Sequence, residues 1–134
     1  MSYITELISY RSDEHPNLLW LEVKTEDGVI GLGETFFAAE ALEAYIHINL
    51  APIVLGLNAE DIGLVHHKSR PYVGFVGAGM ELRAQSALDI ALWDALGKSV
   101  NLPLSIILGG RIRHQIPVYN TCAGNHYVRG PKVG

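Results

Sequence analysis

The spacing of apolar residues changes at Phe37, and this change limits the possible folds more than any other feature. Residues 3–11 and 18–25 place apolar side chains at every second position, and residues 29–35 form a third short run. A period of two is typical of a half-buried β-strand. After Phe37 the apolar residues recur every three or four positions, as on one face of a helix. The sequence therefore predicts an α+β fold.

Turn-forming residues separate the three runs. Asp27-Gly28 lies between the second and third runs, and Asp-Gly between apolar runs is typical of a tight hairpin. The first connection, residues 12–17, is polar and contains Pro16, which indicates a loop. Short connections favour pairing of neighbours, so we expect a three-stranded antiparallel meander.

A three-helix bundle is expected after the sheet, with helices near residues 38–50, 58–70 and 80–98. Pro52 and Gly56 follow the first of these and are expected to close it. Asn58, with Asp61 behind it, resembles the N-cap of the second helix.

The third helix carries apolar residues on two sides. One stripe consists of Ala84, Ala87, Leu88, Ala91, Leu92, Ala95 and Leu96. The opposite side of the helix is only weakly polar and carries a second stripe of residues: Ser86, Ile90, Trp93 and Gly97. A helix with two apolar faces is normally covered on both. We therefore expect the surface around Ile90, Trp93 and residues 102–108 to be exposed or covered by another chain.

Composition excludes several classes of protein. The 134 residues suit one globular domain, since 49% are apolar and 18% are charged. The formal charge of −4, without a basic run, argues against nucleic-acid and anionic-membrane partners. No apolar stretch is long enough to cross a membrane, and the polar start does not resemble a signal peptide. The single cysteine, Cys122, has no internal partner for a disulfide, so a cytoplasmic location is expected.

Residues 115–121 (QIPVYNT) have the composition of one more strand, followed by a tail rich in glycine and proline. Two interpretations fit this pattern. The segment is either an edge strand that completes a small α+β domain, or the first strand of a further domain that is interrupted at Gly134.

Four segments resemble the mandelate racemase and muconate-lactonizing branch of the enolase superfamily. They are GLGET at 31–35, ALDIALWDALGK at 87–98, LPLSIILGG at 102–110 and IPVYNT at 116–121. The resemblance covers nearly the whole chain, in order.

The resemblance implies two domains. Residues 1–113 would be the N-terminal capping domain, and residues 114–134 the start of a truncated (β/α) barrel. Gln115–Thr121 would be the first barrel strand.

The resemblance also implies a chemistry for the full-length enzyme. Such enzymes remove the proton next to a carboxylate and stabilise the resulting anion with Mg²⁺, a hard ion that prefers oxygen ligands. In that family the metal ligands and bases lie on later strands, so no residue here is expected to be catalytic or to bind metal. This chain alone is expected to be inactive.

The reaction is less constrained by the resemblance. An acid-sugar dehydratase is favoured by YVGFVGAG at 72–79 and YNTCAGN at 119–125. A racemase, epimerase or cycloisomerase of the same superfamily stays open, as does a stand-alone binding or dimerisation module without catalysis. A sugar acid as substrate and a homo-oligomeric assembly are expected.

In the resembled family, two cap segments lean over the barrel mouth, and here they are Ser12–Asn17 and Thr35–Ala38. The substrate-binding candidates are His15, Phe36, Phe37 and Thr121. His15 supplies the only imidazole in these segments, and Thr121 ends the expected barrel strand. Because the two phenylalanines are consecutive, one is expected to pack inward and the other to line the pocket. The alternative is an exposed His15 and two phenylalanines that only pack the core.

Other polar residues have plainer interpretations. Asp94 and Lys98 are spaced for an ordinary helical ion pair. His66 and His67 point about 100° apart on a helix, which disfavours a shared metal ion. By the resemblance, Glu34 is structural at the seam between cap and barrel.

Overall fold

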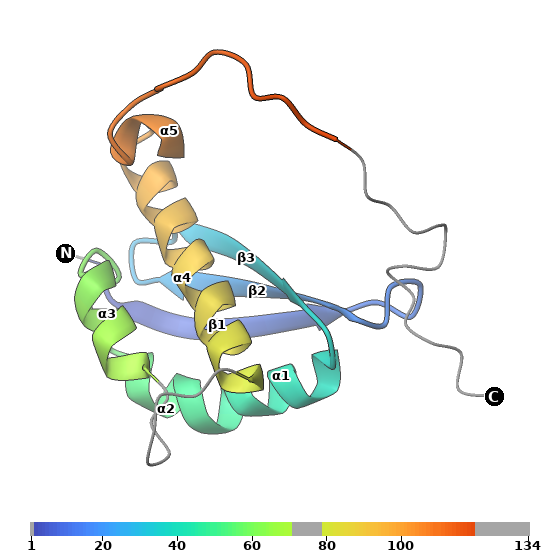
Figure 1. Cartoon of the computed structure of the whole chain (residues 1–134). Helices are drawn as coiled ribbons and strands as arrows, with labels where there is room; N and C mark the ends of the chain where they lie inside the picture. Colours follow the sequence, from blue (N-terminus) through green and yellow to red (C-terminus); the bar gives the residue numbers. More distant parts are fainter. Residues whose placement is uncertain (1, 71–78, 120–134) are drawn as a thin grey trace.

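The computed structural model describes residues 2–70 and 79–119 of the chain. Strands β1 (Ile4–Arg11), β2 (Leu18–Thr25) and β3 (Ile30–Phe36) form an antiparallel sheet in that order, as Figure 1 shows. Leu7 pairs with Val23, and Leu21 pairs with Gly33. The predicted meander is confirmed.

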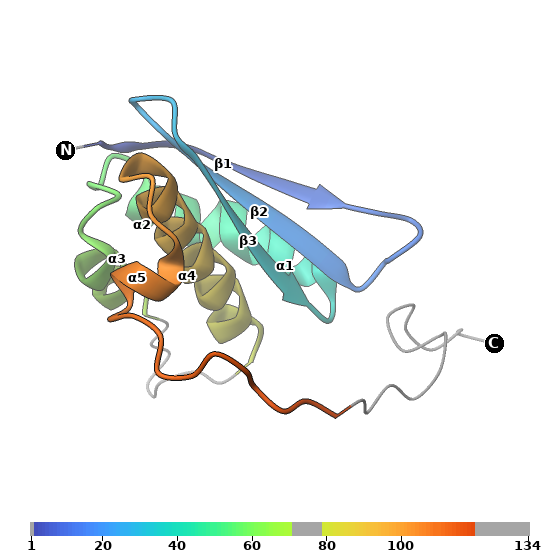
Figure 2. The ribbon, with the colours of Figure 1, turned by 90° about the horizontal axis from the view of Figure 1, so that it is seen from above.

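The helices lie on one face of this sheet (Figure 2). Strand β2 alternates strictly, with one set of side chains buried and the other half-buried. Its buried set is Leu19, Leu21, Val23 and Thr25. The three apolar side chains of this set pack with apolar residues of β1 and of the helices into one core.

The first helical segment is longer than predicted, because Pro52 does not end it. It consists of α1 (Ala39–Tyr45), a π-helical turn η1 (Ile46–Leu50) and α2 (Ala51–Val54). The Ala51 amide donates to the Ile46 carbonyl five residues back, which makes the turn before Pro52 wide. Proline lacks an amide hydrogen and its ring normally clashes with the preceding helical turn, and the wider turn gives it room.

The next helix, α3 (Ile62–Ser69), starts later than predicted. Asp61, not Asn58, precedes it, and Asp61 provides no side-chain cap. Asn58 instead accepts hydrogen bonds from the amides of Ser2 and Glu60, at 3.3 Å each. Its side chain therefore stabilises the turn that holds the N-terminal segment.

Helix α4 (Met80–Ser99) crosses β3 at very short range, where the strand has Gly31 and Gly33. A Cβ atom added at Gly31 would overlap the Ala91 carbonyl oxygen, and one at Gly33 would overlap that of Ala87. Two glycines on the strand and a stripe of alanines on the helix let the two backbones touch. This explains the Gly-Leu-Gly sequence of β3.

The chain after α4 forms a short helix, α5 (Leu104–Ile107), and then an exposed segment. The prediction of a strand at 115–121 is wrong for residues 115–119, which form none, and the rest of that range lies outside the described residues. A strand needs a neighbour to accept and donate its backbone hydrogen bonds. The described part of the chain offers residues 115–119 no such neighbour.

The second side of α4 is only partly covered within the described residues, because Gly97 is buried against residues 102–107 whereas other positions remain open. Ile90 is exposed and Trp93 is half-buried. Leu102, Ile106 and Leu108 are exposed as well.

None of the described helices is long and apolar enough to cross a membrane.

Candidate functional site

The two predicted cap segments lie side by side at one end of the sheet. Strand pairing places Leu18 opposite Phe36, and the Phe37 amide donates to the Asn17 carbonyl at 2.8 Å. The last residue of the β1–β2 loop is therefore bonded directly to the turn that follows β3. The two segments form one structural unit.

A hollow of about 620 Å³, which we call the loop hollow, opens beside this unit. Its walls come from the end of β1, the β1–β2 loop and the first residues of α1. The lining residues are Arg11, Ser12, Asp13, Pro16, Ala38, Ala39, Glu40 and Ala41. The charged side chains and the open shape suit a polar ligand.

The turn between β3 and α1 has a strained backbone. Phe37 and Ala38 have φ angles of 78° and 53°, in the left-handed region. This region costs a residue with a Cβ roughly 1–2 kcal/mol, and a bulky side chain there is uncommon. Such residues persist where the surrounding structure holds them, and they are frequent at functional sites.

Phe36 and Phe37 are both exposed, at 50% and 57%, so the expectation that one packs inward is wrong. The left-handed φ of Phe37 redirects the chain, and consecutive rings can then approach the same group. That group is Arg83, near the start of α4, with its guanidinium 4.8 Å and 5.7 Å from the two ring centres. Its Nη1 also donates to the Phe36 carbonyl at 3.3 Å.

Sequence reasoning missed Arg83, because only the tertiary fold brings α4 to the β3–α1 turn. A guanidinium above an aromatic ring is attracted to it by about 0.5–1 kcal/mol at an exposed site. The two exposed rings and the half-buried Arg83 thus form a positively charged edge beside the loop.

His15 is half-buried, and its ring is not among the groups that line the loop hollow. Its backbone closes the loop, since its amide donates to Ser12 at 3.2 Å and its carbonyl accepts from Leu18 at 2.9 Å. Its Nδ1 atom is shielded from solvent without a hydrogen-bond partner among the described residues. Thr121 lies outside the described residues.

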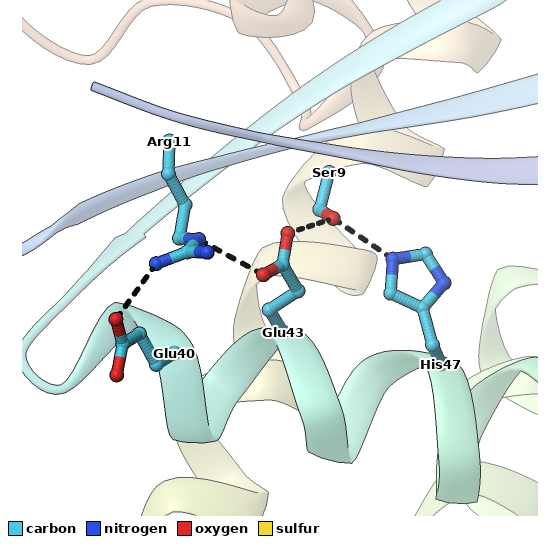
Figure 3. Close-up of polar contacts among 5 residues, drawn as sticks. All are labelled: Ser9, Arg11, Glu40, Glu43 and His47. Carbon is cyan, nitrogen blue, oxygen red and sulfur yellow. Dashed lines mark hydrogen bonds and ion pairs between the residues drawn. The ribbon is translucent and has the colours of Figure 1, made fainter. Parts of the chain in front are cut away.

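Five polar side chains connect β1 to the helix beside it, and we call them the β1–α1 clamp (Figure 3). They are Ser9, Arg11, Glu40, Glu43 and His47. The Ser9 hydroxyl donates to Glu43 Oε1 at 2.8 Å and lies 2.8 Å from His47 Nε2. Because the hydroxyl proton goes to Glu43, His47 must donate to Ser9. The imidazole is then not available as a base for the hydroxyl, and this group is not a nucleophile triad.

Other polar pairs fasten elements together. The predicted pair of Asp94 and Lys98 is present at 2.7 Å, and it also reaches β3. Asp94 accepts from the Leu32 amide at 2.7 Å, and Lys98 donates to the Ile30 carbonyl at 2.8 Å. The pair therefore satisfies backbone groups on the β3 edge, where unpaired groups invite association.

Three other polar side chains are placed by the fold. Glu34 accepts from Trp20 Nε1 at 2.9 Å on the outer face of the sheet. His66 lies 3.3 Å from Asp89. Among residues 2–70 and 79–119, no three histidine, cysteine, aspartate or glutamate side chains converge as a metal site.

Residues 6–109 match the family model described as the mandelate racemase / muconate lactonizing enzyme N-terminal domain. The chain belongs to this family. A D-galactonate dehydratase of Verminephrobacter eiseniae (strain EF01-2) is 31% identical over 127 residues, covering 91% of this chain and 32% of that protein. A D-mannonate dehydratase of Novosphingobium aromaticivorans is 31% identical over 111 residues, covering 81% of this chain and 28% of that protein.

The fold of this mandelate racemase / muconate lactonizing enzyme N-terminal domain recurs in solved structures. An enolase protein from environmental shotgun sequencing of the Sargasso Sea has a TM-score of 0.86 and 49% identity, covering 92% of this chain and 34% of that one. The chain thus spans about a third of the length of these relatives. The predicted family and the predicted α+β fold are both confirmed.

Proposed function

We propose that this chain is the capping domain of an acid-sugar dehydratase of the enolase superfamily. The observation that carries the proposal is the likeness to a D-galactonate and a D-mannonate dehydratase, in each of which the matched part is about a third of the protein or less. In this proposal residues 1–113 form the cap and residues 114–134 begin the (β/α) barrel. The whole enzyme removes the proton next to the substrate carboxylate and then expels a hydroxyl as water.

The cap contributes selectivity. His15, Phe36, Phe37 and Thr121 are proposed to contact or enclose the end of the substrate that is remote from the carboxylate. The bonded pair of loop and turn supports this role for the first three, and the exposure of both rings supports it for the two phenylalanines. Loops of this kind exclude water from a barrel mouth and strengthen electrostatic interactions within it.

Mg²⁺, implied by the family, has no converging ligands among the described residues. We propose that later strands of the barrel in the full-length enzyme, and not residues of this chain, would supply the oxygen ligands of this ion. The pure 134-residue chain is correspondingly expected to turn over no sugar acid, and measurable turnover by it would contradict the proposal.

The partly covered second side of α4 supports a further expectation. Exposed Ile90, Leu102, Ile106 and Leu108 form apolar surface of the kind that marks protein contacts. We propose that the barrel covers this apolar surface in the full-length enzyme. We also propose that the enzyme is a homo-oligomer and that it works in the cytoplasm. Light scattering on the full-length enzyme gives the number of subunits.

The reaction is tested with the full-length enzyme and a panel of sugar acids. A product that is lighter than the substrate by one water molecule indicates dehydration. A product of the same mass as the substrate, with altered stereochemistry or a closed ring, indicates a racemase or cycloisomerase. No change of any carboxylate substrate would favour the stand-alone binding module.

The selectivity role is tested by His15→Ala, Phe36→Ala, Phe37→Ala and Thr121→Ala in the full-length enzyme. We expect at least one to change the ratio of kcat/KM between two sugar acids by about tenfold, the loss of one or two good contacts. Ile48→Ala is the matched control, since Ile48 is 71% exposed on the π-helical turn and lies outside both cap segments. If all four variants keep the wild-type ratios, these residues are scaffold only.

A further inference from the structure

Arg11 is the last residue of β1 and directly precedes the β1–β2 loop. Its guanidinium contacts two carboxylates of α1, with Nη1 3.1 Å from Glu40 and Nε 2.9 Å from Glu43 (Figure 3). Ser9, two residues earlier and on the same side of the strand, reaches Glu43 and His47. The end of β1 is thus attached to one face of the helix by four polar contacts.

The spacing along the helix makes this attachment possible. Glu40, Glu43 and His47 are separated by three and four positions, which places them on one face. Glu40 and Glu43 belong to α1, and His47 belongs to the π-helical turn that follows it. All three side chains meet the same strand. The clamp is built from local helix geometry and one strand end.

The clamp connects the two segments that form the candidate site. Helix α1 begins at Ala39, directly after the strained residues Phe37 and Ala38, while Arg11 adjoins the loop. Arg11 and Glu40 also line the loop hollow. At its other end the loop is bonded to the turn through Asn17 and Phe37. Both ends of residues 12–17 are therefore held against the same turn and helix.

The two carboxylates do not contribute equally. The Glu40 side chain is 87% exposed, whereas that of Glu43 is 31% exposed. An exposed ion pair is weakened by water and salt, and a partly shielded pair less so. Glu43 also accepts from Ser9, so the contact of Arg11 with Glu43 is the stronger part of the clamp.

We propose that Arg11 is a positioning residue: through Glu43, it fixes residues 12–17 and the 36–38 turn in one geometry, and selectivity among sugar acids depends on that geometry. The selectivity part rests on the proposed function, whereas the ordering of the loop does not. Arg11 acts through the segments it holds and needs no contact with the substrate.

The first test measures amide hydrogen exchange in the full-length protein. Arg11→Ala and Glu43→Gln are expected to accelerate exchange in residues 12–17 and 37–39 by about tenfold, with β2 unchanged. Glu40→Gln is expected to have a smaller effect. Arg11→Lys restores only part of the protection, because an ammonium group cannot bridge two carboxylates as a guanidinium does.

Lys24→Ala is the matched control, since it removes a surface ion pair of 3.1 Å with Glu6 at the opposite end of the same sheet. It is expected to leave exchange in residues 12–17 at the wild-type rate. Wild-type exchange there in Arg11→Ala, or an equal acceleration throughout β2, would overturn the proposal.

The second test compares kcat and KM of the same variants for two sugar acids. We expect Arg11→Ala and Glu43→Gln to change the kcat/KM ratio between the two substrates at least fivefold, mainly through KM, and Lys24→Ala to leave it unchanged. Accelerated exchange with an unchanged ratio would overturn the selectivity role. If the wild-type enzyme dehydrates no sugar acid, the proposed function fails, and the exchange result alone then decides the ordering role.

Discussion

The two ends of β3 differ in how they use glycine. Where β3 crosses α4, Gly31 and Gly33 have ordinary φ angles and are needed because the helix backbone leaves no space for a side chain. Where β3 leads into α1, the φ angles are positive, yet the residues are Phe37 and Ala38. In the first region glycine is needed because the helix backbone lies too close for a side chain. In the second region side chains are kept although the left-handed backbone conformation is unfavourable for them. Strain retained in this way indicates selection for something other than stability.

The largest expected effect is at the crossing. Gly33→Ala places a Cβ against the Ala87 carbonyl, and a backbone obstacle cannot rotate away as a side chain would. We expect the free energy of unfolding to fall by about 3 kcal/mol, the upper part of the usual range for overpacking. Urea denaturation of the full-length protein measures it.

Gly63→Ala is the control for this change. Gly63 lies within α3, and a Cβ there meets no atom within 4 Å. The better helix propensity of alanine should raise the free energy of unfolding by about 0.5–1 kcal/mol. If Gly33→Ala were equally harmless, the two backbones would not be in contact.

At the other end of β3 the same comparison predicts a gain. Ala38→Gly removes the left-handed penalty of about 1–2 kcal/mol, less the entropy lost by glycine on folding, about 0.5–1 kcal/mol. We expect the free energy of unfolding to rise by about 0.5–1 kcal/mol. Ala44→Gly, at an exposed position of α1, should lower it by about 1 kcal/mol. Equal losses in both variants would show that Ala38 is not strained.

The β2–β3 hairpin gives the smallest expected effect. Gly28 provides the positive φ angle of this turn. Asp27, beside it, accepts hydrogen bonds from the Ser2 and Thr25 hydroxyls, both at 2.6 Å. These bonds stabilise the ionised carboxylate and lower the pKa of Asp27. The stability that these two bonds contribute is complete above the pKa of an aspartate in the unfolded chain, about 4. It is lost as the pH falls through the lower pKa of the folded state.

Asp27→Asn should therefore flatten the acid side of the curve of unfolding free energy against pH. The change is expected to be small, because the carboxylate is exposed and water can replace its partners. Thermal unfolding at several pH values below neutral measures it. A curve that keeps its wild-type slope would contradict the role given to these two hydroxyls.

Much of the fold was predictable from local patterns. The change of period at Phe37 separated sheet from helices, and Asp27-Gly28 located the hairpin. The effect of Pro52 was predicted wrongly. Proline normally ends a helix when an ordinary helical turn precedes it, and no residue pattern in the sequence indicates the π-helical turn that precedes Pro52 here. The strand at 115–119 failed for a different reason: its composition favours a strand, but pairing depends on a neighbour.

The candidate site was only partly predictable. The proximity of residues 12–17 to 36–38 follows from hairpin pairing, which any antiparallel meander would produce. The exposure of both phenylalanines was not predicted, because neither Phe37 nor Ala38 is a residue type associated with positive φ. Arg83 and the β1–α1 clamp depend on tertiary packing between elements that are distant in the sequence.

The wide turn at Ile46–Leu50 corrects a mismatch of phase. Leu42, Ile46, Leu50 and Val54 follow each other at intervals of four and are all buried, at 1% exposure or less. In a regular helix four residues turn the chain by about 400°, so three such intervals would rotate the last side chain about 120° away from the first. A π-helical turn has more residues per revolution and takes up much of this drift. Loss of one residue within Ile46–Leu50 would leave about eleven residue steps from Leu42 to Val54, which turn a regular helix by about 1,100°, close to three full turns, so the faces of α1 and α2 would keep their phase.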